Sequence, residues 1–299
     1  MKINGVEIID TYAEAFPIWF SRVIITADSY ELAKIAAVEA TGFATSAIYC
    51  PCEAGIERLY EPSETPDGRP GISIFICTAR KSLKENVADR VSQCILTAAT
   101  TAVFDGFPDV KTTRFNTQIR FFGDKYESRV EVGGRKCWSI PVMEGDFICE
   151  DRFGGVKGIA GGNFFIMGKD RASALKAAQE AVKAFENTEG IIASFPGGIV
   201  ASGSKVASKN YKFPMPASTN HKFCPSLKGK IEDSEVPDGV NAIYEIVING
   251  LNAEVISAAM KKGILAATGV DGILYIGAGN YGGKLGTNNF YLHKILEGC

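Results

Sequence analysis

The chain has 299 residues, 46% of them hydrophobic and 22% charged, a composition typical of a globular protein rather than a disordered one. A net charge of −2 argues against a general nucleic-acid binder, and no uninterrupted apolar run approaches the roughly 20 residues of a membrane span. The first residues lack the basic-then-apolar order of a signal peptide, so we expect a cytoplasmic protein.

The first half of the chain contains two strand–helix patterns. Residues 22–26 and 46–50 are expected strands, and the helical spacing of apolar residues predicts a helix over 29–41 between them. Residues 71–77 are expected to form a strong strand that opens the second pattern. Ser82 and the Glu three positions later match a capping box that would open the next helix. Three β-rich runs follow, at 113–122, 126–132 and 136–143.

The second half repeats this plan. A helix is expected over 170–187 with Leu175 facing inward, and a second helix should begin after Asn252, whose side chain can cap it. The expected strands lie at 163–167, 243–248, 273–276 and 290–292.

The repeat predicts an internal duplication. Residues 144–162 hold six glycines and form the expected boundary between an N-terminal lobe, 1–148, and a C-terminal lobe, 149–299. Paired βαβ units fit two α+β lobes of ferredoxin-like (split βαβ) type with antiparallel sheets, or one long parallel sheet. The β-rich stretch after residue 112 breaks strict alternation, which favours the duplicated α+β fold.

Eight cysteines are too sparse and irregular for a disulfide framework. Cys50 and Cys52 are one residue short of the CxxC spacing, and only His221 and His293 could supply imidazole. We therefore expect no metal site and interpret most of the thiols as small apolar core residues in a reducing compartment.

The segment Gly277–Gly282 matches GxGxxG and follows an expected strand. A dinucleotide site would need a helix, another strand and an acid about 20 residues later, and only 17 residues remain. We interpret the glycines as a loop that allows close approach of a ligand or of another chain. The sequence holds neither a GxSxG nucleophile elbow nor a Walker A motif.

Residues 190–231 contain six lysines and no Asp or Glu. This basic tract is rich in Gly, Ser and Pro, as expected of loops. It is either a basic rim that attracts an anionic small molecule, or a solvated loop whose charges pair with acids elsewhere. The lysines are Lys205, Lys209, Lys212, Lys222, Lys228 and Lys230.

Glu245 interrupts an otherwise apolar strand. Alternation places it on the same face as Val247 and Asn249, whereas Ile246 and Ile248 take the other face. Desolvation in such a strand would raise the pKa of the carboxyl and keep it protonated near neutral pH, able to donate a hydrogen bond or a proton. A solvent-facing or ion-paired glutamate is the alternative.

Several runs together resemble the formylmethanofuran:tetrahydromethanopterin formyltransferase family. The matching segments span nearly the whole chain in family order: 40–43, 53–57, 65–71, 161–164, 195–202, 244–251 and 278–286. The resemblance implies two associated ferredoxin-like lobes, a homotetramer and no prosthetic group. It implies transfer of a formyl group from the amine of methanofuran to N5 of tetrahydromethanopterin in one-carbon metabolism and methanogenesis, with both carriers as substrates.

The resemblance also implies roles for individual residues. Glu245 occupies the position of the family's catalytic glutamate, and Asn249, on the same strand face, is expected to assist it. The expected substrate-binding residues are Asp67, Arg69, Gly162, Asn163, Ser202, Lys205, Asn280 and Lys284.

Two alternatives remain open. Changes from the family pattern near 44–52 and 213–217 fit a non-catalytic paralogue that binds a carrier or a partner subunit. A bacterial version that works within a formyltransferase/hydrolase complex is the other alternative.

Overall fold

The computed structural model describes residues 1–208, 210–284 and 286–298. The chain divides into two compact units. Unit 1 consists of residues 1–17 and the chain from residue 159 onward, and unit 2 consists of residues 18–158. The N-terminal segment therefore packs with the second half of the chain, and the lobe boundary at residue 148 stays a prediction of the sequence repeat.

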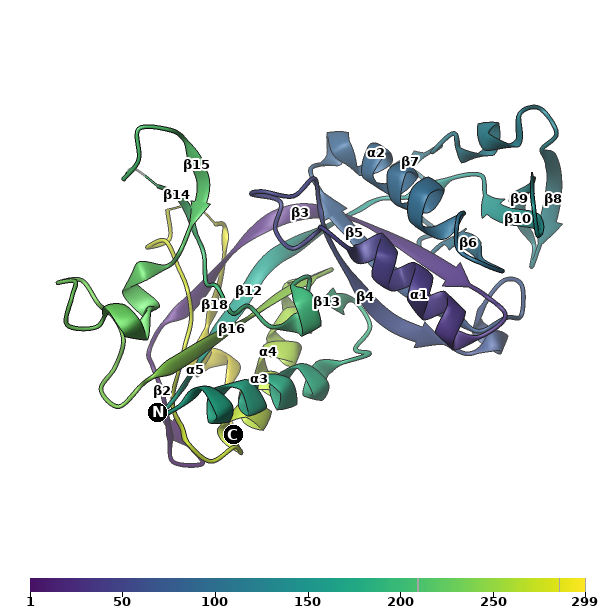
Figure 1. The fold of residues 1–299 in the computed structure, drawn as a ribbon. Helices are drawn as coiled ribbons and strands as arrows, with labels where there is room; N and C mark the ends of the chain where they lie inside the picture. The colour runs from purple at the N-terminus through teal and green to yellow at the C-terminus, as the bar shows by residue number, and fades with distance from the viewer. Residues whose placement is uncertain (209, 285, 299) are drawn as a thin grey trace. The chain divides into compact units, whose positions relative to one another are not determined.

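Unit 2 contains a complete βαββαβ motif. Strand β5 pairs antiparallel with β3 and β4, and β6 pairs antiparallel with β3, giving the order β6-β3-β5-β4. This order is that of a split-βαβ sheet, and α1 and α2 lie along it (Figure 1). The elements are β3 (Tyr12–Thr26), α1 (Tyr30–Thr41), β4 (Glu53–Tyr60), β5 (Gly71–Thr78), α2 (Arg80–Arg90) and β6 (Ala102–Asp105).

The β-rich sequence after residue 112 extends this sheet. Strand β10 pairs in parallel with β6 and antiparallel with β9, which pairs with β8. These later elements are β7 (Arg114–Phe115), β8 (Ser128–Val132), β9 (Arg135–Val142), β10 (Gly145–Glu150) and β11 (Phe153–Gly154).

Unit 1 repeats the motif. Strand β12 pairs antiparallel with β16 and β17, and β13 pairs antiparallel with β16, so the order is β17-β12-β16-β13. The motif consists of β12 (Val156–Gly168), α3 (Arg171–Phe185), β13 (Ile191–Ile192), β16 (Ala242–Gly250), α4 (Ala253–Thr268) and β17 (Ile273–Gly277). The duplicated α+β fold is thereby confirmed, and a single parallel sheet is wrong.

Shorter elements complete unit 1. They are β1 (Lys2–Ile3), β2 (Val6–Ile8), β14 (Lys205–Ser208), β15 (Met215–Ser218), β18 (Asn288–Tyr291) and α5 (Leu292–Ile295). Strands β14 and β15 form a separate hairpin within the basic tract. No helix among residues 1–208, 210–284 and 286–298 has both the length and the apolar character needed to cross a membrane.

The two faces of the unit 1 sheet have different partners. Phe164 and Ile246 belong to a core that includes residues of α3 and α4, and both helices lie along this sheet (Figure 1). Phe165 and Met167 alternate with Phe164 and Ile166 along the same strand. They instead pack against Val236 and other residues of the segment that follows the basic tract. The period-2 alternation of strands produces this division, and Glu245 lies on the face opposite the helices.

Two expected helix starts are confirmed. The Ser29 hydroxyl accepts the backbone N–H of Leu32 at 3.2 Å, and the Asn252 side chain accepts that of Val255 at 2.9 Å. Each bond satisfies one of the N–H groups that the first turn of a helix leaves without a partner.

Other local predictions are wrong. Residues 46–50 form turns, where the Ala47 N–H donates to the Glu53 carboxylate at 2.9 Å, and the strand begins only at Glu53. Helix α2 starts at Arg80, before the expected capping box, and the Ser82 N–H already donates to Ala79. Residues 119–123 form a 3₁₀ helix instead of a strand.

Leu175 does not face inward. The buried face of α3 is formed by Ala174, Ala177, Ala178 and Ala181, while Leu175 is 37% exposed. Small side chains allow α3 to pack closely on the sheet and on α4, and this close tertiary packing overrides the larger hydrophobic signal of the leucine.

Candidate active site

Two cavities lie on the sheet face opposite α3 and α4 in unit 1, and Glu245 lines both. The larger has a volume of about 440 Å³ and the smaller about 180 Å³. Phe165 and Phe223 also border both cavities, and their ring centroids are 4.7 Å apart. The carboxyl of Glu245 therefore lies where the two cavities meet, beside an aromatic pair.

The Glu245 backbone is held rigidly. It pairs with β12 opposite Phe165, and on its other side it exchanges two hydrogen bonds with Val200, at 2.8 and 3.1 Å. The residue thus lies in an interior strand, with neighbours on both sides.

The Glu245 side chain is half-buried, and within the described residues its carboxyl receives no hydrogen bond. Burial removes water that would stabilise the charged form, and this desolvation raises the pKa to about 8. The group is mainly protonated at neutral pH and can act as a donor, as the strand pattern predicts. Among the described residues no cation pairs with this carboxyl, so the ion-paired alternative is wrong, and its burial disfavours the solvent-facing one.

Asn163 fixes the first part of the glycine loop that borders the larger cavity. Its Nδ2 donates to the carbonyls of Gly161 and Gly279, both at 3.1 Å, and its Oδ1 accepts the Gly279 N–H at 2.6 Å. A Cβ on Gly279 would lie 3.0 Å from the Phe165 ring, so the close approach of loop and strand requires glycine there.

Glu14 holds the rest of this loop. Its carboxylate, only 2% exposed, accepts the backbone N–H groups of Tyr281, Gly283 and Gly286 at 2.7, 2.9 and 2.5 Å. Asn280 adds bonds to the Thr11 hydroxyl and to the carbonyl of residue 12. The glycines therefore let the backbone curl around a buried carboxylate.

The basic tract is partly neutralised by the acids that follow it. Lys222 pairs with Glu235 at 2.9 Å, and Lys228 pairs with Asp238 at 2.7 Å. Lys205 lies in the larger cavity wall, and its Nζ donates to the His221 Nδ1 at 2.6 Å. The tract therefore combines lysines paired with acids and one lysine, Lys205, in the cavity wall. Lys209 lies outside the described residues.

His221 links Lys205 to an acid. Because its Nδ1 accepts from Lys205, the neutral ring carries its proton on Nε2, which faces Asp233 Oδ2 at 3.3 Å. The ammonium of Lys205 is thus held in a fixed direction at the cavity wall.

The structure brings together only some of the expected site residues. Asn163, Lys205 and Asn280 line the larger cavity with Glu245, and Ser202 lines the smaller. Lys284 is exposed on the glycine loop and borders neither cavity.

Two expected site residues lie behind the cavities. Asn249 is fully buried and accepts the Gly161 N–H at 3.0 Å, where β12 shifts its register. Gly162 faces α4, since a Cβ there would lie 2.4 Å from a methyl group of Ile256. Both residues shape the strand that carries the site.

Asp67 and Arg69 belong to unit 2. Asp67 accepts the Thr26 hydroxyl at 2.6 Å and Arg69 Nε at 2.9 Å, and Arg69 also donates to Asp28 at 3.2 Å. These bonds hold the turn before β5 to the end of β3.

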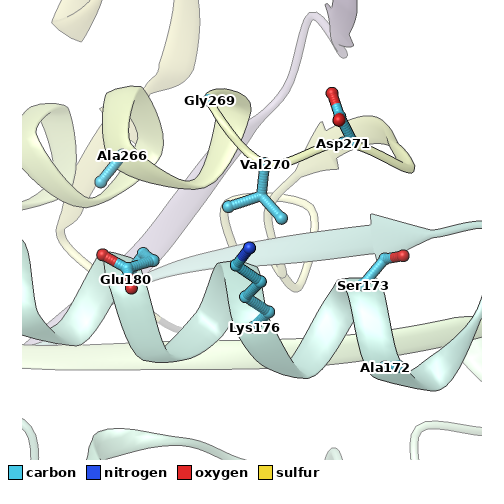
Figure 2. Close-up of a pocket in the computed structure, with 8 residues that line it drawn as sticks. All are labelled: Ala172, Ser173, Lys176, Glu180, Ala266, Gly269, Val270 and Asp271. Atoms are coloured by element: carbon cyan, nitrogen blue, oxygen red, sulfur yellow. The ribbon is translucent and has the colours of Figure 1, made fainter.

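A further hollow, of about 610 Å³, lies between α3 and the turn after α4 (Figure 2). Its titratable side chains, Lys176, Glu180 and Asp271, are all exposed. Although this hollow is larger, it lacks a desolvated acid, so we assign the candidate active site to the Glu245 cavities. No cluster of three His, Cys, Asp or Glu side chains that could hold a metal ion occurs among the described residues.

Four residues of the site are not among those expected from the sequence: Glu14, Phe165, Phe223 and Tyr281. Strand alternation could have found Phe165, which pairs with Glu245. Glu14 lies 267 positions before Tyr281, and no local pattern connects them.

Comparison with known proteins identifies the family of the chain. Residues 1–142 match the model of the formylmethanofuran-tetrahydromethanopterin formyltransferase family, and residues 145–295 match the model of its proximal lobe. The chain belongs to this family. The formyltransferase of Methanosarcina acetivorans is 59% identical and that of Archaeoglobus fulgidus 57% identical, each match covering 99% of this chain and 100% of the relative.

Solved structures of family members have the same fold. The formyltransferase from Methanosarcina barkeri superposes with a TM-score of 0.94 at 56% identity, over 99% of this chain and 100% of that one. The formyltransferase/hydrolase complex from Methylorubrum extorquens, solved with methylofuran, gives 0.92 at 40% identity, over 99% of each chain. The chain is thus more similar in sequence to the Methanosarcina barkeri formyltransferase than to the matching chain of the Methylorubrum extorquens complex.

The departures from the family pattern at residues 44 and 52 have a packing role. Ala44 and Cys52 are 1% and 0% exposed and belong to the hydrophobic core of unit 2. The altered segment 213–217 includes β15, the second strand of the hairpin in the basic tract.

Proposed function

We propose that this chain catalyses reversible transfer of the formyl group of N-formylmethanofuran to N5 of tetrahydromethanopterin in archaeal-type one-carbon metabolism, with Glu245 as the proton donor. The observation that carries the proposal is a desolvated carboxyl, with its pKa raised to about 8, at the meeting point of two cavities in a chain of the formyltransferase family. The carriers bind as substrates in a ternary complex, and no prosthetic group takes part.

The reaction places clear demands on the site. The N5 amine attacks the formamide carbon, a new C–N bond forms, and negative charge develops on the carbonyl oxygen. The bond to the methanofuran nitrogen then breaks, and the proton lost by N5 balances the proton gained by the leaving amine. The site must align both carriers, stabilise the oxygen and deliver a proton.

Glu245 meets the need for a proton donor. A carboxyl with a pKa of about 8 is protonated at neutral pH, yet it gives up its proton more readily than an alcohol does. After donating to the leaving amine it can recover a proton from N5, so the enzyme ends the cycle unchanged.

The pair Phe165 and Phe223 meets the need to exclude water from the site. Water that reached the tetrahedral intermediate would release formate instead of passing the formyl group on. Phe165 and Phe223 border both cavities beside Glu245, and their apolar rings oppose water entry.

Lys205 fits the acidic tails of the carriers. Its ammonium lies in the wall of the larger cavity and is fixed by His221. We assign it to binding of a substrate anion, and we keep Asn163, Ser202 and Asn280 as binding residues on their positions in the cavity walls.

For Asn249 and Gly162, the contacts favour roles in shaping the strand. Asp67, Arg69 and Lys284 remain candidate binding residues on the family resemblance alone. That resemblance also supports a cytoplasmic homotetramer built from two-lobed chains with halves 1–148 and 149–299.

The experiment mixes purified protein with formylmethanofuran and the reduced pterin and follows the N5-formyl product. We expect turnover by the wild-type chain and a loss of about 10²-fold or more in the Glu245→Gln variant. Glu180→Gln, an exposed substitution on α3, is the matched control. No product from the wild-type chain would support the non-catalytic paralogue, and full activity of Glu245→Gln would remove Glu245 from the mechanism.

A further inference from the structure

Tyr281 lies in the wall of the larger cavity together with Glu245. Its side chain is half-buried, and its ring centroid lies 6.4 Å from that of Phe16. Burial raises the pKa of the Tyr281 phenol, and ionisation of the neighbouring Glu245 raises it further, so this hydroxyl keeps its proton. The cavity therefore holds two neutral O–H groups within electrostatic reach of one another.

The position of Tyr281 is set by its backbone. Its N–H donates to Glu14 Oε2 at 2.7 Å, and the same carboxylate holds Gly283 and Gly286 on the far side of the turn. A buried carboxylate bonded to three backbone N–H groups makes a rigid anchor, because charge-assisted hydrogen bonds are roughly twice as strong as neutral ones.

The Tyr281 hydroxyl is able to donate a hydrogen bond. The nearby backbone of Val206 on β14 lowers the pKa of this phenol and so partly offsets the effect of burial. Within the residues that the structure describes, no acceptor takes its own proton. A tyrosine hydroxyl is both donor and acceptor, so its donor capacity remains available to a molecule in the cavity.

We propose that Tyr281 is a second hydrogen-bond donor of this site, and that its hydroxyl binds the formyl oxygen on which negative charge develops. This inference rests on the proposed function. It resolves a conflict in the chemistry, because one acid cannot hold a proton against the oxygen while it delivers that proton to the leaving nitrogen. A donor that never loses its proton can stabilise the oxygen throughout.

This arrangement assigns a separate task to each group. Once Glu245 has passed on its proton it is a carboxylate, which would repel a neighbouring oxyanion unless another donor balanced the charge. Tyr281 supplies that donor. Every proton is accounted for, since the tyrosine hydrogen bond forms and breaks without transfer.

The test is Tyr281→Phe, which removes one oxygen atom and keeps the ring against Phe16. We expect kcat to fall about 10²-fold, as for loss of one oxyanion donor. KM for each carrier should change by less than about threefold, because the interaction forms mainly in the transition state. Tyr244→Phe, one residue before Glu245 on the same strand, is the control and should keep wild-type kinetics. A wild-type kcat in Tyr281→Phe, or a change confined to KM, would overturn the inference.

A double variant separates this inference from the role of Glu245. If the two groups act in one transition state, Tyr281→Phe combined with Glu245→Gln should lose much less than the product of the two single losses. Fully multiplicative losses would contradict joint action. If Glu245→Gln is fully active while Tyr281→Phe is impaired, the proposed proton donor fails and the tyrosine donor stands.

Discussion

Replacing Glu245 with Gln tests the desolvation argument through stability as well as activity. In the folded chain the carboxyl has a pKa raised from 4.5 to about 8. In the unfolded chain it ionises at its ordinary value. Between these values the folded state binds more protons than the unfolded state, so the free energy of unfolding falls as pH rises and levels off above about 8.

The size of the change in the free energy of unfolding follows from the pKa shift of Glu245. At 1.36 kcal/mol per pKa unit, a change from 4.5 to about 8 has an upper limit of about 5 kcal/mol. Partial exposure of the side chain admits water and reduces this figure, so we expect about 2–4 kcal/mol. Gln has nearly the same shape and no charge, and the variant should therefore gain stability over the wild type across this pH window.

Denaturant unfolding of both proteins at pH 5, 6.5 and 8 provides the assay. The titration of every other group is common to both chains, so it cancels in the difference between them. The advantage of the variant should be small at pH 5 and largest at pH 8. A difference that does not change with pH would show that Glu245 is not desolvated and would refute the reasoning. In the wild type, kcat should fall as pH rises through about 8, because the proton donor is lost.

Three further experiments test the surroundings of the site. Glu14→Gln replaces a charged acceptor of three backbone N–H groups with an amide. We expect faster amide hydrogen exchange at Tyr281 and Gly283 and a lower kcat. Unchanged hydrogen exchange at these two residues would contradict the role of Glu14 as an anchor. Gly162→Ala places a methyl group 2.4 Å from Ile256 and should destabilise unit 1 by about 1–3 kcal/mol in denaturant unfolding, with partial rescue by Ile256→Ala; unaltered stability would count against this packing. The double variant Lys205→Gln, Lys212→Gln should raise KM and weaken the dependence of KM on ionic strength. Lys228→Gln is the control and should leave both unchanged, because Lys228 is already paired with Asp238 in the wild type. If the double variant keeps the wild-type dependence on ionic strength, the basic tract does not attract the substrate.

The sequence determined the elements whose signals are local. Helical spacing and side-chain caps located α1 and α4, and alternation correctly separated Glu245 from Ile246. Local patterns failed where a tertiary contact competed with them. The buried face of α3 is formed by alanines and not by Leu175, because α3 packs tightly on its neighbours. Residues 46–50 form a turn and not a strand, because the Glu53 carboxylate accepts the Ala47 N–H.

Only the tertiary structure decided what surrounds Glu245. Alternation predicts which face a side chain takes, but what covers that face depends on residues far away in the chain. The aromatic wall comes from Phe223, and the loop opposite is held by Glu14, from the other end of the chain. These contacts form only when the sheet has closed, because hydrogen bonds and packing between distant segments leave no periodic pattern in the sequence.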